Sequence, residues 1–258
     1  MTRMFNFIKR TWNPVVGCSH YCYRGKCWAK RMAKRVAGRT GCEKCAMFYP
    51  HVHPERLKPL RVRKPATIFV VSMGDLFCDA VPDVVIRLVL EAMAESKGPI
   101  TWFLETKNPA RYRHFLNLIP PNTILSTTIE GTDDFDWDGK TRLSRAPLPR
   151  ERYLAFANLD WPRKHVSIEP ILGFELDDFV SWIKDIGPER VSIGYDNWGL
   201  KLPEPTLEHT LRLIHAIRKL GIEVEIKTLR PAYWEPRTHV LPLDLELLAG
   251  VRRIGWTR

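Results

Sequence analysis

Apolar and polar residues are arranged along this chain in blocks that predict strands alternating with helices. Short apolar runs rich in Val, Ile, Phe and Thr are typical of buried strands, and they cover 67–72, 100–106, 123–130, 165–169, 190–194 and 222–227. Helical spacing of apolar residues covers 27–38, 82–94, 109–118, 150–159, 176–186 and 206–220. Strands and helices that alternate at this spacing imply parallel, right-handed crossovers. We therefore expect an α/β fold.

Ionisable residues stand at or just after the ends of the predicted strands. They are Asp75, Glu105, Lys107, Glu130, Glu169, Asp196 and Lys227. In a parallel barrel the carboxyl ends of the strands share one face, where sites are built. This favours a partial (β/α) barrel of about six parallel strands over an open doubly wound sheet. We expect one domain over 1–258, with an irregular, basic, cysteine-containing insertion at about 39–65.

Three cysteines within ten residues are the strongest chemical signal. Cys18, Cys22 and Cys27 have the spacing C-x3-C-x4-C, which differs from the paired C-x2-C knuckles of zinc ribbons. Three thiolates from one N-terminal loop leave one metal position open, which suits an iron–sulfur cluster with an exposed iron. The alternative is a closed zinc site completed by His20, Cys42 or Cys45.

Composition places these thiols in a reducing compartment. No apolar run approaches the roughly 20 residues of a membrane span, and the N-terminus lacks a secretion signal, so we expect a soluble cytoplasmic protein with free thiols. The formal charge of +11 favours a polyanionic partner. Basic and aromatic residues flank the cysteines, as expected for nucleic acid, DNA or RNA, although a solvated helix face is the alternative.

A second, closer thiol pair is formed by Cys42 and Cys45. Together with His51, His53 or Cys78 it is a candidate site for zinc or a second cluster, and the alternative is a pair of ordinary thiols. Cys78 is also a candidate catalytic hydrogen-atom donor, although such a cysteine is more often simply packed.

Several motifs in order resemble a known family. They are Trp12-Asn13-Pro14, Cys27-Trp28-Ala29-Lys30-Arg31-Met32-Ala33, Ser72-Met73-Gly74-Asp75-Leu76-Phe77, Glu105-Thr106-Lys107-Asn108-Pro109 and Ser167-Ile168-Glu169-Pro170-Ile171-Leu172-Gly173. The chain resembles an uncharacterised family of phages and prokaryotes that looks like a branch of the radical S-adenosylmethionine (radical SAM) superfamily, distantly similar to spore photoproduct lyase. The superfamily usually has C-x3-C-x2-C, and here two more residues separate the last pair.

The resemblance implies a [4Fe-4S] cluster held by Cys18, Cys22 and Cys27. Its free iron would bind the amino and carboxylate groups of S-adenosylmethionine, and an electron donor would trigger release of a 5′-deoxyadenosyl radical. Gly74 and Asp75 match the position that receives the cofactor's amino group; the alternative for Asp75 is a turn or helix cap.

The resemblance also implies roles for residues farther along the chain. Glu130 resembles the residue that holds the ribose hydroxyls, and Gly194 the backbone beside adenine. Independently of the resemblance, the strand ends offer candidates for holding the cofactor's carboxylate, as Lys107, or for contacting substrate, with Glu169 favoured as catalytic because Pro170 fixes its direction. The other strand-end candidates are Glu105, Asp196 and Lys227. The alternatives are a solvated carboxylate for Glu130 and structural ion pairs for the other charged residues.

These observations predict a radical SAM enzyme that acts on nucleic acid, in repair or base modification. One alternative is a non-catalytic zinc or iron–sulfur protein that binds nucleic acid. The other is a radical enzyme for a small anionic metabolite.

Overall fold

A computed structural model describes residues 5–133 and 142–236. The contacts divide the chain into two compact units, which are described separately. Unit 1 contains residues 1–127, 143–147 and 159–163, and unit 2 contains residues 128–142, 148–158 and 164–258.

Unit 1 is built on parallel strands in the order β1-β4-β5-β6. These are β1 (Ile8–Trp12), β4 (Ala66–Val70), β5 (Ile100–Thr106) and β6 (Thr123–Thr128), of which Thr128 belongs to unit 2. Trp12 pairs with Val70, Val70 with Leu104, and Leu104 with Leu125. Phe5, Ile8, Phe69, Phe103 and Ile124 form a buried cluster on this sheet. The carboxyl ends of β1, β4 and β5 are therefore fixed in register.

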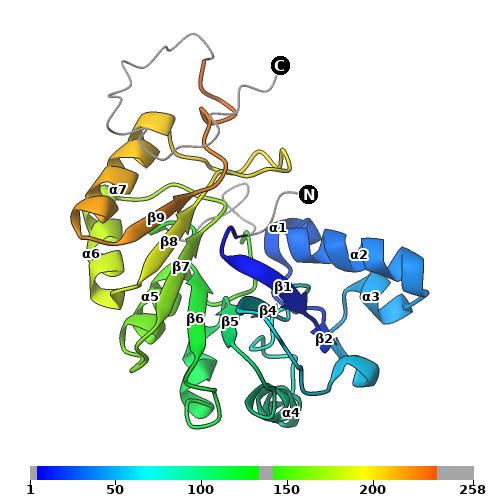
Figure 1. The fold of residues 1–258 in the computed structure, drawn as a ribbon. Helices are drawn as coiled ribbons and strands as arrows, with labels where there is room; N and C mark the ends of the chain where they lie inside the picture. The colour runs from blue at the N-terminus through cyan, green and yellow to red at the C-terminus, as the bar shows by residue number, and fades with distance from the viewer. Residues whose placement is uncertain (1–4, 134–141, 237–258) are drawn as a thin grey trace. The chain divides into compact units, whose positions relative to one another are not determined.

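Helices connect the strands and extend unit 1. Helix α4 (Asp83–Ala94) joins β4 to β5 and buries Ile86, Val89, Leu90 and Met93 at helical spacing. A 3₁₀ helix, η2 (Pro109–His114), follows β5. The strands β2 (Val15–Val16) and β3 (His51–Val52) pair antiparallel, and helices α2 (Trp28–Thr40) and α3 (Glu43–Met47) lie together near them (Figure 1). The short elements α1 (Cys22–Gly25) and η1 (Pro54–Arg56) complete this part.

Unit 2 contains the parallel strands β7 (Lys164–Ile168), β8 (Arg190–Ile193) and β9 (Glu223–Ile226). Helices α5 (Pro149–Ala157), α6 (Leu176–Ile186) and α7 (Leu207–Lys219) lie along one side of them (Figure 1). Val166, Val191 and Val224 stand in one row across the three strands. The chain turns from α6 into β8 at Gly187, which has a φ of 59° that favours glycine.

The structure confirms the α/β class and the parallel strands, and it corrects three details. The strand β1 was not predicted, and it adds a seventh parallel strand within the described residues. The predicted helix over 109–118 is replaced by the 3₁₀ helix η2 and turns. The insertion at about 39–65 was predicted to be irregular, but it contains α3, β3 and η1. The closure of the strands into a partial barrel and the single domain stay predictions. The described helices include none with the length and apolar character needed to cross a membrane.

Candidate functional site

The carboxyl ends of β4 and β5 carry a buried network centred on Asp75. Its Oδ1 accepts hydrogen bonds from Phe77 N at 2.9 Å and Thr106 Oγ1 at 2.7 Å. Its Oδ2 lies 2.9 Å from His20 Nε2 and accepts a bond from Lys107 N at 2.9 Å. Burial alone would raise the pKa of Asp75, but the hydrogen bonds and the His20 charge lower it. Asp75 is therefore an ionised centre that binds donors of its own chain.

Asp75 in turn raises the pKa of His20. Burial would lower the pKa of this imidazole, but the bond to Asp75 and the Asp75 charge leave it raised. The ligand atoms of Cys18, His20 and Asp75 lie within 4.8 Å of one another. The imidazole is therefore held, and kept basic, directly beside a thiol.

Burial and neighbouring groups shift the pKa values of the thiols in and beside the segment 18–27. The Cys18 pKa is raised well above its usual value, first by a hydrogen bond to the Cys78 sulfur, then by burial and by neighbouring charges that include Cys22. The Cys27 pKa is raised first by burial and then by Cys22. The bond from Cys18 lowers the pKa of the Cys78 thiol to about 6. Cys78 therefore lies directly beside Cys18, and the charge of Cys22 acts on both other thiols of the segment.

The segment 18–27 has an uncommon backbone. Tyr21, Tyr23 and Arg24 have φ values of 50°, 52° and 54°, a left-handed conformation that costs non-glycine residues roughly 1–2 kcal/mol each. Residues 143–145 hold this turn: Tyr23 N donates to Leu143 O at 2.6 Å, and Arg145 N donates to His20 O at 2.7 Å. Tertiary contacts therefore maintain a strained turn that carries the thiols.

Lys107 and Gly74, both predicted to contact the cofactor, make contacts within unit 1 that the fold itself explains. The Lys107 Nζ donates to Tyr23 Oη at 3.2 Å and lies 5.1 Å from the centre of that ring. A Cβ atom on Gly74 would lie 2.4 Å from the Gly17 carbonyl oxygen, because the two glycines form a parallel bridge. Close approach of two backbones therefore explains a glycine at position 74.

The remaining predicted residues lie in unit 2, each with a partner there. The carboxylate of Glu130 accepts a 2.7 Å bond from Arg152 Nη1, and both side chains are buried. Glu169 Oε2 lies 2.9 Å from Lys227 Nζ. A Cβ on Gly194 would lie 3.1 Å from the Lys227 Cβ, so the chain packs closely there too. The alternative of a solvated carboxylate is wrong for Glu130, which is 3% exposed, and its contact with a cofactor stays a prediction.

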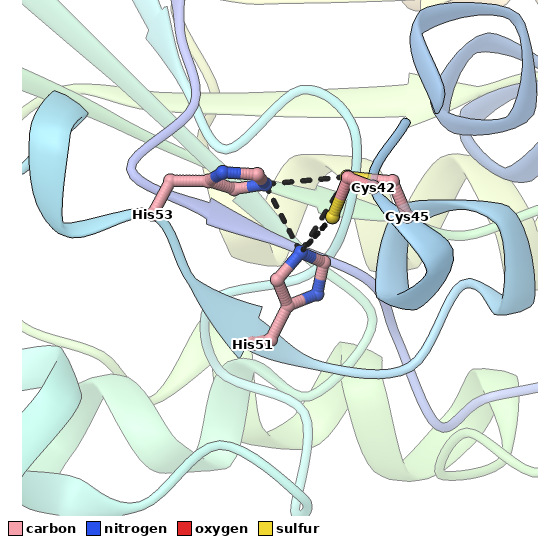
Figure 2. Close-up of side chains that lie close together, drawn as sticks. All are labelled: Cys42, Cys45, His51 and His53. Atoms are coloured by element: carbon pink, nitrogen blue, oxygen red, sulfur yellow. Dashed lines mark hydrogen bonds between the residues drawn. The ribbon is translucent and has the colours of Figure 1, made fainter. Parts of the chain in front are cut away.

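Cys42 and Cys45 lie with His51 and His53 in unit 1, and Cys78 does not take part in this group (Figure 2). Two further residues contact this part of the chain. The sequence indicates His20 only as a ligand that completes a zinc site, and it gives no indication of Ser144, whose Oγ lies 3.2 Å from Cys22 Sγ. His20 stands between two of the cysteines, which is a signal that sequence alone offers. Ser144 is 122 residues from its partner and has no such signal.

Within residues 5–133 and 142–236, the fold and these side chains define an α/β protein with two groups of metal-competent residues. A family model described as a protein of unknown function (DUF5131) matches residues 2–179, well over half of the chain. The chain belongs to this family. No curated protein matches it.

Proposed function

We propose that this protein is an iron–sulfur enzyme of the radical SAM type that acts on nucleic acid. The observation that carries the proposal is that Cys18, Cys22 and Cys27 lie on one short strained turn, buried or half-buried, with Cys18 beside His20 and Asp75. Three thiolates suit a [4Fe-4S] cluster that keeps one iron open, whereas a structural zinc site has four ligands. The finer fold expectation, a partial barrel of the radical SAM kind, belongs to the same proposal.

The neighbouring residues have separate tasks in this proposal. A [4Fe-4S] cluster held by Cys18, Cys22 and Cys27 would pass one electron from an external donor to bound S-adenosylmethionine, whose S–C5′ bond would break to give methionine and a 5′-deoxyadenosyl radical. Burial raises the pKa of the Cys27 thiol, and the positive charge of Lys107 acts in the opposite direction, toward the thiolate that would bind iron. Asp75 positions His20 and the Lys107 backbone, because the chain's own donors already occupy both of its oxygens.

The surface around the thiol segment supports a nucleic-acid substrate. Tyr21 is 52% exposed, and Lys30 Nζ and Arg145 Cζ lie 5.7 Å and 5.1 Å from the centre of its ring. Helix α2 contains five basic residues and no acidic one, and Lys34, Arg35 and Arg39 are exposed. An exposed aromatic ring with cations around it stacks on a base while the cations neutralise phosphates.

The cluster is tested by anaerobic reconstitution. The protein is expected to hold about four iron and four sulfide per chain, and reduction with S-adenosylmethionine is expected to release 5′-deoxyadenosine. Replacing Cys27 with Ala should abolish both, whereas Ser181→Ala, at an exposed position of α6, is the control that keeps them. A colourless protein that holds zinc and forms no 5′-deoxyadenosine would refute the proposal in favour of a non-catalytic protein.

The substrate class is tested by oligonucleotide binding at several salt concentrations. Neutralising Lys34, Arg35 and Arg39 with Gln should flatten the plot of log affinity against log salt by up to about 2–3, since each phosphate contact contributes about 0.7–0.9. The control removes the same charge from Lys184, Arg212 and Lys219, which are exposed on α6 and α7. Absence of binding at low salt would contradict the nucleic-acid substrate and favour a small anionic metabolite.

A further inference from the structure

Four side chains in unit 1 point toward a common centre outside the thiol segment 18–27. Figure 2 shows Cys42, Cys45, His51 and His53 facing one another, and their ligand atoms lie within 4.8 Å of one another. The two Nε2 atoms are 3.0 Å apart, and His53 Nε2 lies 3.2 Å from Cys45 Sγ. His51 Nε2 lies 3.5 Å from both sulfurs.

These separations are those of a tetrahedral metal site. Zn²⁺ binds sulfur at about 2.3 Å and imidazole nitrogen at about 2.0–2.1 Å, so tetrahedral ligands lie about 3.6 Å apart for sulfur and nitrogen and about 3.4 Å apart for two nitrogens. The two His51–sulfur distances of 3.5 Å match these values, and the 3.2 Å and 3.0 Å distances at His53 are shorter by about 0.4 Å. Pairwise thiol–imidazole hydrogen bonds would bring each ring nearer to one sulfur, yet His51 is equidistant from both.

The outer nitrogens of both rings support the same interpretation. His51 Nδ1 lies 2.7 Å from Tyr49 O, and His53 Nδ1 lies 3.1 Å from Glu55 Oε1. A carbonyl and a carboxylate accept hydrogen bonds, so each Nδ1 carries the proton and each Nε2 presents a lone pair. Metal-binding histidines characteristically donate their outer N–H to such groups. Two lone pairs that face each other at 3.0 Å are favourable only around a cation.

Local structure explains how neighbouring residues reach this geometry. Cys42 precedes α3 and Cys45 lies in its first turn, so one helical turn places both sulfurs on the same side. His51 and His53 are two residues apart in extended backbone, where alternate side chains share a face. His53 N also donates to Pro14 O at 2.7 Å, which fixes the segment against β2.

We propose that Cys42, Cys45, His51 and His53 form a structural zinc site. Two thiolates and two imidazoles close a tetrahedron and leave no position for substrate, which is the pattern of a structural site. On binding, the two thiols lose their protons to solvent and no redox change takes place. This site is distinct from the proposed iron–sulfur site and does not depend on it.

The zinc site would stabilise the segment that carries the other cysteines. Cys45 packs with Val16, Ala33 and Phe48 in a buried cluster that Cys18 and Cys27 border. The amide of Cys18 donates to Phe48 O at 3.4 Å. Zinc therefore ties α3 and β3 to the backbone that begins the thiol segment 18–27.

The first test is metal analysis of the full chain without reconstitution. We expect about one zinc per chain, and stoichiometric rebinding after chelation. Co²⁺ in its place should give the intense visible bands of a tetrahedral ion and a thiolate charge-transfer band. Zinc below about 0.1 per chain with no rebinding, or an octahedral cobalt spectrum, would overturn the proposal.

Variants locate the ion and separate this proposal from the iron–sulfur one. Replacing Cys42 and Cys45 with Ser should remove the zinc and lower the melting temperature. His51→Ala, which removes one half-buried ligand, should weaken zinc affinity at least tenfold in a chain that still folds. His114→Ala changes an exposed histidine as the control, and the triple Ser variant of Cys18, Cys22 and Cys27 should keep its zinc. Loss of zinc from the triple variant together with retention in His51→Ala would place the ion elsewhere.

Discussion

Replacing Asp75 with Asn tests whether this carboxylate serves the fold or only a cofactor. The amide keeps the size of the side chain, but its NH₂ group cannot accept a hydrogen bond. Asp75 accepts two bonds on each oxygen, so either orientation of the substituted amide leaves two buried donors without their acceptor. In one orientation these are His20 and the Lys107 amide, and in the other Phe77 N and Thr106.

The expected cost follows from the number and kind of lost bonds. Hydrogen bonds to a charged group contribute about 1.5–3 kcal/mol each, so the loss of two lowers the free energy of unfolding by about 3–6 kcal/mol. This is a large part of the roughly 5–15 kcal/mol that stabilises a typical domain. The effect should be present in protein without cofactor, because the four donors belong to the chain.

Urea unfolding followed by circular dichroism measures this difference. Asp79→Asn is the matched control, because Asp79 is exposed and accepts a single 2.9 Å bond from Asn108 that an amide oxygen can also accept. The control should change the unfolding free energy by less than about 0.5 kcal/mol. If Asp75→Asn unfolds like the control, and loses only affinity for S-adenosylmethionine, the structural role argued for Asp75 is wrong.

Two further predictions concern unit 2. Glu130→Gln should lower the unfolding free energy by about 3–5 kcal/mol, since it leaves the buried Arg152 charge uncompensated. The control Glu223→Gln, at an exposed ion pair with Arg190, should lower it by less than about 1 kcal/mol. Equal decreases in the two variants, measured by urea unfolding, would contradict the reasoning. Burial and the charges of Arg190 and Lys227 lower the pKa of His165 to about 3. In the unfolded chain the histidine has a pKa of about 6.5, so as pH falls the unfolded state binds a proton before the folded state does. His165 should therefore leave the unfolding free energy unchanged above about pH 6.5 and lower it by about 1.4 kcal/mol per pH unit as pH falls toward 4. The difference in stability between wild type and His165→Asn, measured by urea unfolding from pH 7 to 4, should show this slope, and a constant difference would refute it.

The elements that sequence predicted well are those whose burial is visible in local pattern. The apolar run at 67–72 corresponds to β4, and the helical spacing at 206–220 to α7. Strand β1 has the sequence IKRTW, in which three exposed residues separate two buried ones, so it lacks the alternation of a strand. Its pairing with β4 is a tertiary effect that no local window contains.

The helix expected at 109–118 shows how a side chain can override spacing. Tyr112 is fully buried, and its single hydroxyl proton is shared between the carbonyl oxygens of Leu104 and Ser126, each 3.0 Å away. These bonds draw the segment onto β5 and β6, and a tight 3₁₀ turn accommodates this better than a continuous α-helix. The apolar periodicity at this place reports burial correctly but does not distinguish the two helix types.

The candidate site was predictable where its residues are close in sequence. Cys42, Cys45, His51 and His53 fall within twelve positions, so the sequence narrowed the partners of the thiol pair to a short list that included both histidines. His20 and Asp75 are 55 residues apart, and their contact depends on the way in which β4 places its carboxyl end beside the cysteines. Spacing rules give ligand types, whereas only the fold gives such long-range pairs.

The hydrogen-bond and ion-pair partners seen in the structure change which of the predicted site residues are evidence for a function. The carboxylates of Asp75, Glu130 and Glu169 are predicted site residues because they follow strands, yet each bonds to a cationic or polar group of its own unit. A charge at a strand end is therefore explained by the fold before any ligand is invoked. The thiols of Cys42 and Cys45 differ, because their sulfurs lie against two imidazoles and not against a charged partner of the fold. Thiols and imidazoles gathered in this way bind a metal once the thiols lose their protons, so the cysteines, rather than the carboxylates, carry the functional argument.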